Sequence, residues 1–434
     1  MNGGRLARRI VPAFLLLLVM AYVTWDMVEG RALAGDIDAI AARGEPVTLR
    51  DHVFGADTPE RHDAARIYAA ALERVKAMPQ DVTYRLPRLD VDNVVGPPLD
   101  LEAMEKIYRP DAPALQLLDQ ATPLDFNGFG ELAPDVAEGS MNNLNYLAAA
   151  RADLLSVRGK GDEAAAAIIP CVRLWRAASP FSRPIVTTRV AGSIRILLRH
   201  TSPGGGALED LQRTMEGLPP GDDLERQVAL SRARFIDQMH APKASLSETI
   251  AARVLRPWIT RQTRRALASF DETLSMARED WPRKFVRWGA LEAKYAERFQ
   301  RGGRRPTYLE RLSPGDWVGA MAMPVSMIAA GRDIAMRRVI VATLAVERYR
   351  REHAGKLPGS LDVLVPRYLA AVPTDPFSGH PLVYLPAADR YLVYSVDDNR
   401  KNDGGILYGF GSKGQLTPRQ REPHDLGIAV EMRH

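Results

Sequence analysis

Apolar residues form one uncharged run at the start of the chain, from Ile10 to Trp25, and three arginines precede it. As an α-helix, a run of this length rises about 24 Å, close to the roughly 30 Å thickness of a bilayer's hydrocarbon core. Because the basic residues lie on the N-terminal side, the run predicts a single transmembrane helix with its N-terminus in the cytoplasm. We therefore expect a single-pass protein of the inner (cytoplasmic) membrane, with most of the chain on the periplasmic or extracytoplasmic side.

A cleaved signal peptide is the alternative interpretation of the first 34 residues. Ala32-Leu33-Ala34 has the small-x-small form that signal peptidase accepts. Asp26 and Glu29 lie between the apolar run and this site, which makes the approach to cleavage unusually long and charged. An uncleaved anchor is therefore favoured over a cleaved signal, and both are favoured over a buried core helix.

From residue 35 to residue 330, apolar residues recur with a helical period that proline and glycine interrupt. The pattern predicts helices over 59–78, 185–200 and 208–215, two helices within 142–179, and another from 222. The two helices within 142–179 are joined by a Gly-Lys-Gly-Asp break and resemble the helical hairpins of tetratricopeptide-like proteins. No fixed period repeats along the chain, so we predict a helical array without a named repeat.

After Gly331 the pattern changes to a long helix followed by short strands. The helix is expected over about 333–353, and two strands, 382–385 and 391–396, are joined by five residues that suit a hairpin. The predicted fold class is mainly α, a helical array, with a small C-terminal α+β module and a single N-terminal transmembrane helix. The predicted domains are the anchor or signal peptide (1–34), a helical extracytoplasmic domain (35–330) and the α+β module (331–434).

The C-terminal module carries three sequence elements in order: LDVLVPRYLAAVPTDPFSGHPLVY, YLVYSVDDN and NDGG. With these elements it resembles the globular domain of the major pseudopilin of type II secretion, and related modules that end many bacterial envelope proteins. The similarity covers residues 333 to about 405, and its Asp-Pro-Phe/Trp-x-Gly element is the most specific part. The resemblance implies one long helix packed on a small antiparallel sheet, and a calcium site in the loop after the Tyr-x-x-Tyr-Ser strand.

Two features separate this chain from that family. It has no prepilin-peptidase signal, and about 300 residues lie between its anchor and its module, whereas pilins fuse the two into one helix. We therefore infer a fold module used outside ordinary pilus processing and assembly.

The loop that follows the second predicted strand supplies the candidate metal ligands. Within seven residues it carries three carboxylates, Asp397, Asp398 and Asp403, and two amides, of which Asn402 completes the predicted ligand set. Such oxygen donors suit calcium, which takes about six to eight of them. The alternative is a solvated turn, because Asn, Asp and Gly are also the preferred turn residues. Calcium is the one cofactor that the loop and the resemblance together suggest.

The basic residues of the chain are unevenly distributed. Residues 253–311 contain 15 Lys or Arg and 7 Asp or Glu, an excess of +8, whereas the whole chain carries +5 and the remainder therefore −3. Four of the six tryptophans fall in or next to this stretch. It is a candidate for contact with anionic lipid or an envelope polymer, although a solvated basic face with its tryptophans in the core is favoured. The extracytoplasmic location argues against nucleic acid as a partner.

The sequence lacks the motifs of zinc proteases, nucleophile elbows, phosphate loops and dinucleotide sites. Cys171 is the single cysteine, which excludes an intrachain disulfide and a cysteine-based zinc site, and its apolar neighbours predict an inert buried thiol. The acidic pairs Asp222-Asp223 and Glu279-Asp280 are expected to face solvent.

These observations favour a membrane-anchored, non-catalytic scaffold or binding protein with a protein partner in the envelope, associated with a secretion or assembly system. The alternative is an envelope-polymer hydrolase whose active site is assembled from scattered acidic residues of the helical domain. A deep cleft with converging acids would favour the hydrolase, and a smooth array with a groove would favour the scaffold.

Overall fold

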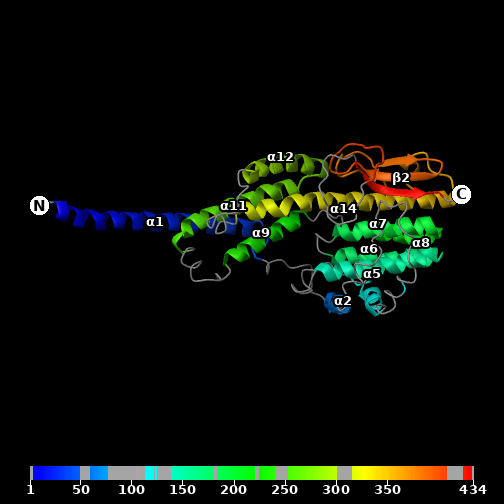
Figure 1. Cartoon of the computed structure of the whole chain (residues 1–434), viewed down its shortest axis with the longest axis horizontal. Coiled ribbons are helices and arrows are strands. Elements are labelled where there is room, and N and C mark those ends of the chain that lie inside the picture. Colours follow the sequence, from blue (N-terminus) through cyan, green and yellow to red (C-terminus); the bar gives the residue numbers. More distant parts are fainter. Residues whose placement is uncertain are drawn as a thin grey trace. The chain divides into compact units, whose positions relative to one another are not determined.

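The computed structural model shows a mostly helical chain with one small antiparallel sheet (Figure 1). Two compact units are present, and each combines two stretches that are distant in sequence. We call Met1–Val53 with Leu224–Ser326 the first unit, and Phe54–Asp223 with Met327–His434 the second unit. The structure describes residues 3–48, 59–76, 105, 113–121, 123–124, 138–178, 183–219, 224–240, 253–300, 315–407 and 424–432.

The first unit contains the long N-terminal helix α1 (Gly3–Ala42) and, among others, α11 (Arg256–Ala277). Residues 11–20 of α1 are all exposed. This part belongs to a helical stretch that is long and apolar enough to cross a membrane. The part of α1 that follows packs against α11. The helix is thus more than twice as long as the predicted apolar run, and its two halves have different surroundings.

Two further helices complete the described core of the first unit. They are α9 (Leu224–His240) and α12 (Trp281–Gln300). The rings of Phe235 on α9 and Phe270 on α11 lie 5.8 Å apart between centroids. Trp281 and Trp288 of α12 are both buried, so these two tryptophans of the basic stretch contribute to the core.

Besides a helical segment at residues 113–121, five helices of the second unit form the described part of the predicted array (Figure 1). They are α2 (Pro59–Lys76), α5 (Glu138–Val157), α6 (Gly161–Ala177), α7 (Arg183–His200) and α8 (Gly205–Glu216). Helices α5, α6 and α7 pack against one another, α2 packs on α5, and α8 packs on α6. Fully buried alanines such as Ala152 and Ala164 allow the α5 and α6 backbones to approach closely. The helix pair predicted within 142–179 is therefore confirmed.

The sheet of the second unit has three antiparallel strands in the order β1-β2-β3. They are β1 (Val383–Pro386), β2 (Arg390–Ser395) and β3 (Leu426–Glu431). The predicted hairpin is confirmed as β1 and β2, whereas β3 was not predicted. Gly427 of β3 lies opposite Tyr394, and a Cβ at this position would be 2.4 Å from the tyrosine side chain. Only glycine therefore fits this position of the register.

Helix α14 (Gly315–Glu352) corrects the prediction of a helix that begins at about residue 333. Gly331, where the sequence pattern changes, lies inside this helix and is buried. Glycine in a helix interior costs about 1 kcal/mol relative to alanine. Burial of the flanking Met327 and Ile334 outweighs that cost. The chain therefore enters the C-terminal module as a continuous helix, with no break after residue 330.

Candidate functional site

The candidate metal ligands lie in the loop that follows β2, next to α14. Asp397 is fully buried and has a positive φ of 53°. Arg332 of α14 donates from Nε to the two oxygens of Asp397, at 2.8 and 3.1 Å, and from Nη2 to Asp398 at 3.3 Å. One guanidinium therefore pairs with both neighbouring carboxylates.

His424, just before β3, completes this cluster. Its Nε2 lies 3.2 Å from an oxygen of Asp398 and 3.6 Å from one of Asp397. Among the described residues, Asp397, Asp398 and His424 offer ligand atoms that all lie within 4.8 Å of one another. The antiparallel register of β2 and β3 pairs Ser395 with Leu426 and so brings His424 to the loop. We call these three residues and Arg332 the loop cluster.

The other two predicted ligands use their oxygens in hydrogen bonds of the loop. Asn402 Oδ1 accepts from the Tyr394 hydroxyl and from the backbone N–H of Gly404, both at 2.9 Å. Asp403 Oδ2 accepts from Asn399 Nδ2 and from the backbone N–H of His424, both at 2.7 Å. The structure therefore brings Asp397 and Asp398 together, while Asp403 is not part of the converging group.

The surroundings of the loop acids shift their pKa values in different directions. Burial raises the pKa of Asp397, against the attraction of Arg332. The hydrogen bond from Asn399 lowers the pKa of the half-buried Asp403. Burial also raises the pKa of Asp425, which accepts from the backbone N–H groups of Asp403 and Gly405. Asp397 is thus the acid of the loop cluster that most needs a cation beside it.

The Asp-Pro-Phe element fixes the strand that leads into this loop. Asp375 is buried, and its Oδ1 accepts from the backbone N–H of Phe377 and from the Ser395 hydroxyl, both at 2.9 Å. Its Oδ2 accepts from the backbone N–H of Val396, also at 2.9 Å. One carboxylate therefore holds both its own turn and the end of β2, which gives this sequence element a structural reason.

Calcium at the loop cluster stays a prediction, and the geometry adds a condition to it. Arg332 already neutralises Asp397 and Asp398, so a divalent ion has to displace the guanidinium. We expect calcium to raise the melting temperature of an Arg332→Gln chain more than that of the wild type. In that variant the buried Asp397 lacks its counter-charge, and an ion at a hundredfold excess over its Kd stabilises by about 2.7 kcal/mol.

The measurement is thermal unfolding of the full chain in detergent micelles, with calcium or with a chelator. Arg338→Gln is the matched control, because Arg338 lies on the same helix but donates to the backbone carbonyl of Thr374. Equal melting temperatures of Arg332→Gln with and without millimolar calcium would reject calcium as a ligand. The loop cluster would then be an internal ion pair.

A second group of buried charges lies between α14 and the helical array. Asp333 of α14 accepts from Trp175 Nε1 at 3.1 Å and from the Thr187 hydroxyl. The guanidinium carbons of Arg183 and Arg337 lie 4.2 and 4.5 Å from the Trp175 ring centroid. Burial raises the pKa of Asp333, and the attraction of Arg337 opposes this shift. The cluster joins α6, α7 and α14 through polar contacts within the core.

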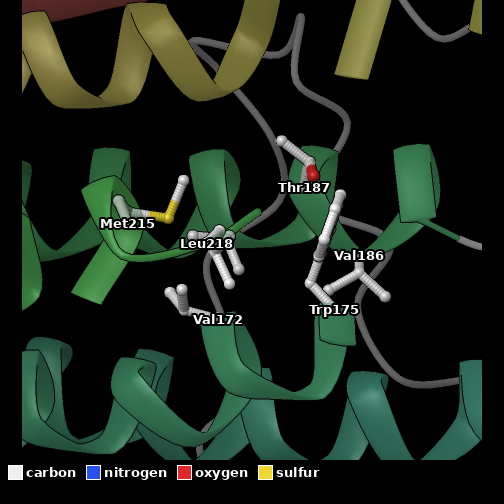
Figure 2. Close-up of a pocket in the computed structure, with 7 residues that line it drawn as sticks. Val172, Trp175, Val186, Thr187, Met215 and Leu218 are labelled. Carbon is white, nitrogen blue, oxygen red and sulfur yellow. The ribbon is translucent and has the colours of Figure 1, made fainter. Parts of the chain in front are cut away.

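Apolar residues beside Trp175 and Thr187 line a narrow space between α6, α7 and α8. Figure 2 shows Val172, Met215 and Leu218 facing this space. It is too narrow to hold a water molecule. The polar atoms of Trp175 and Thr187 are engaged with Asp333, so the space is a packing defect of the core and offers no substrate-binding cleft.

A third buried group lies in the helical array itself. Asp153 of α5 is buried, and burial raises its pKa to about 6, against the attraction of Arg189 on α7. Burial lowers the pKa of Arg189, whose guanidinium lies 4.1 Å from the centroid of Tyr146. Besides Glu138 at its start, α5 carries one other acid, Asp153, and the sequence around Asp153 gave no reason to select it.

The remaining candidate residues have ordinary structural roles. Cys171 is buried and burial raises the pKa of its thiol to about 12, as expected of an inert thiol. Glu279 pairs with Arg287. The pair Asp222-Asp223 and the part of the basic stretch from residue 301 to 311 lie outside the described residues.

No family model, no curated protein and no solved structure matches this chain.

Proposed function

We propose that this protein is anchored in the inner membrane by α1, with its N-terminus in the cytoplasm. Its two units then form an extracytoplasmic, non-catalytic scaffold or binding protein with a protein partner in the envelope. The observation that carries the proposal is the division of α1 into an exposed apolar half and a charged half that is docked on α11.

The docked half of α1 is held by ion pairs along its length. Arg264 of α11 donates to Asp36 at 2.7 Å and to Glu29 at 3.2 Å. Beyond the helix, Glu45 accepts from Arg232 and Arg278, both at 2.7 Å. Despite partial burial, hydrogen bonds from arginines lower the pKa of Glu45 to about 2. Ion pairs therefore hold the charged half of α1 on α11, and the apolar half extends from it.

The same contacts support an uncleaved anchor over a cleaved signal peptide. Glu29 and Asp36 lie on opposite sides of Ala34, and one side chain, Arg264, binds both. Cleavage after Ala34 would remove Glu29 and with it one of the two ion pairs of Arg264. A helix that leaves the mature protein has no need for such contacts.

The C-terminal module supports the link to an envelope assembly system. Tyr391 of β2 donates to Glu347 of α14 at 2.6 Å, which ties the sheet to the long helix. One long helix packed on a small antiparallel sheet is the arrangement that the resemblance to the major pseudopilin implies. A module of that kind, carried on a separate helical array, suits a protein that binds or assembles with a partner.

The hydrolase alternative requires acids that converge at an open surface. Asp153 and Asp333 have raised pKa values, as a general acid needs, but both are closed within the core and face arginines. A polymer substrate cannot reach either carboxyl group. Neither of these two acids therefore supports the hydrolase alternative.

The topology is tested by reporter fusions at His434. We expect a reporter that is active only outside the cytoplasm to work at this position, because the basic residues precede the span. Mass spectrometry of the purified chain should find the residues before Gly35 still attached. A chain that starts at Gly35 would instead establish the cleaved signal peptide.

A charge-reversal variant is the control for orientation. Replacing Arg5, Arg8 and Arg9 with glutamate removes the basic excess on the N-terminal side and should reduce the activity of the extracytoplasmic reporter. A cytoplasm-only reporter that is active on the unmodified chain would contradict the proposed topology.

A further inference from the structure

We propose that the start of α11 forms a second contact with the membrane, in which arginines bind anionic lipid headgroups beside the α1 span. This interfacial surface consists of Arg253 and Val254, just before α11, and of Arg256 and Arg261 on α11. The inference rests on the proposed membrane anchor and goes beyond it, because it assigns a lipid-binding surface to a segment distant from α1 in sequence.

The depth of this surface follows from its contacts with α1. The Tyr22 hydroxyl donates to the backbone carbonyl of Arg253 at 2.6 Å, and Arg256 pairs with Asp26 at 3.3 Å. Tyr22 and Trp25 end the apolar run, and aromatic residues at this place lie at the level of lipid headgroups. The start of α11 must therefore lie at the same level.

Helices α1 and α11 leave this level in the same direction. Contacts progress from Tyr22 with Arg253 to Asp26 with Arg256, and further along to Arg43 with Asp271. In a helix that rises about 1.5 Å per residue, residue 278 is about 33 Å from residue 256. That distance exceeds the Debye length of about 8 Å several-fold. The start of α11, which is also the N-terminal end of the basic stretch 253–311, is thus the part of this helix that can contact the membrane.

The charges at this level favour anionic lipid. Asp26 and Glu29 alone would repel an anionic headgroup, but Arg256 and Arg264 pair with them. Arg256 keeps 69% of its side-chain surface exposed, and Arg261, whose Nε lies 4.0 Å from Glu29, keeps 54%. Val254 is 63% exposed and adds an apolar contact at the interface. The surface therefore combines exposed guanidinium groups with an exposed apolar side chain at headgroup depth.

The test uses the full chain with one added cysteine. Cys171 is buried and does not compete for a thiol-reactive fluorophore. Val254→Cys places the fluorophore on the interfacial surface. Val286→Cys is the matched control, because Val286 is also a valine of the first unit, on α12, and is 61% exposed. Both chains are reconstituted in vesicles of phosphatidylglycerol and phosphatidylcholine that contain headgroup-spin-labelled lipid.

We expect quenching at position 254 to be several-fold stronger than at position 286. It should fall when phosphatidylcholine replaces phosphatidylglycerol, and when Arg253 and Arg261 are both replaced by glutamine. The same replacement of Arg265 and Arg283, which are also exposed, should leave it unchanged. Equal quenching at positions 254 and 286, or quenching at position 254 that does not depend on the charge of the lipid, would overturn the inference.

A third label separates this inference from the proposed anchor. Leu17→Cys lies in the exposed apolar half of α1 and should be quenched by lipid that is spin-labelled on its acyl chain. Absence of this quenching would reject the anchor itself. Quenching at Leu17→Cys without preferential quenching at Val254→Cys would reject only the lipid contact of α11.

Native envelopes test the alternative partner of the same surface. A label at position 254 that is shielded in native envelopes but not in vesicles would assign the surface to an envelope polymer and overturn the lipid proposal.

Discussion

Replacing Asp333 with alanine is expected to lower the free energy of unfolding of the second unit by about 3–5 kcal/mol. The carboxylate of Asp333 accepts from Trp175 and Thr187 and faces the largely buried Arg337. Its removal leaves two buried donors without their acceptor and leaves the guanidinium of Arg337 without its counter-charge. Burial lowers the pKa of Arg337, and the attraction of Asp333 opposes this shift.

Urea denaturation of the full chain, followed by far-UV circular dichroism, measures this loss. Asp333→Asn is the matched control, because it retains an oxygen acceptor of the same size and should lose less. A double variant, Asp333→Leu with Arg337→Met, removes both charges and should recover much of the stability, since replacing a buried ion pair by apolar residues is often neutral. A loss below about 1 kcal/mol in Asp333→Ala would show that the cluster is unimportant for stability.

The helices and the hairpin could be predicted because their signals are local. Thr58-Pro59-Glu60 predicts the start of α2, and the break at Gly159 and Gly161 separates α5 from α6. The start of α14 could not be predicted in the same way, because Gly331 has the local signature of a break. Burial on both sides of Gly331 decides the outcome, and burial depends on partners that are distant in sequence.

The candidate site shows the same limit. The composition of the loop was sufficient to select Asp397 and Asp398. Arg332 and His424 were missed, because the first reaches the loop from α14 and the second through the register of β3. Neither residue lies within a motif that could have marked it as a partner of the acids. Oxygen donors can thus be read from a short segment, whereas the cation that neutralises them depends on the tertiary fold.

A related limit applies to the buried acids. Asp153 lies between Ala152 and Leu154 in α5, and a single acid at such a place is compatible with either a solvent-facing or a buried position. Its burial beside Arg189 follows from the packing of α5 against α7. This burial gives Asp153 a measurable effect on stability, although it provides no argument for catalysis.

The second large effect concerns Asp153 and pH. Its ordinary pKa is 3.8, and burial raises it to about 6 in the folded chain, against the attraction of Arg189. Between these pH values the folded state keeps a proton that the unfolded state has lost, so stability falls as the pH rises. The loss of stability begins near pH 4 and is complete above pH 6. A shift of about two units corresponds to about 3 kcal/mol.

Asp153→Asn cannot lose this proton and therefore avoids the cost. Near pH 4 the free energies of unfolding of the variant and the wild type should differ by a constant amount, which includes the effect of the substitution on Arg189. As the pH rises to 7, we expect the stability of the variant relative to the wild type to increase by about 3 kcal/mol. Urea denaturation of both chains at several pH values measures this change. Asp210→Asn, the same substitution at an exposed position of α8, is the control and should show no comparable increase. A difference between Asp153→Asn and the wild type that is independent of pH would mean that the Asp153 carboxylate is ionised in the core at pH 4, and that Arg189 compensates for its burial completely.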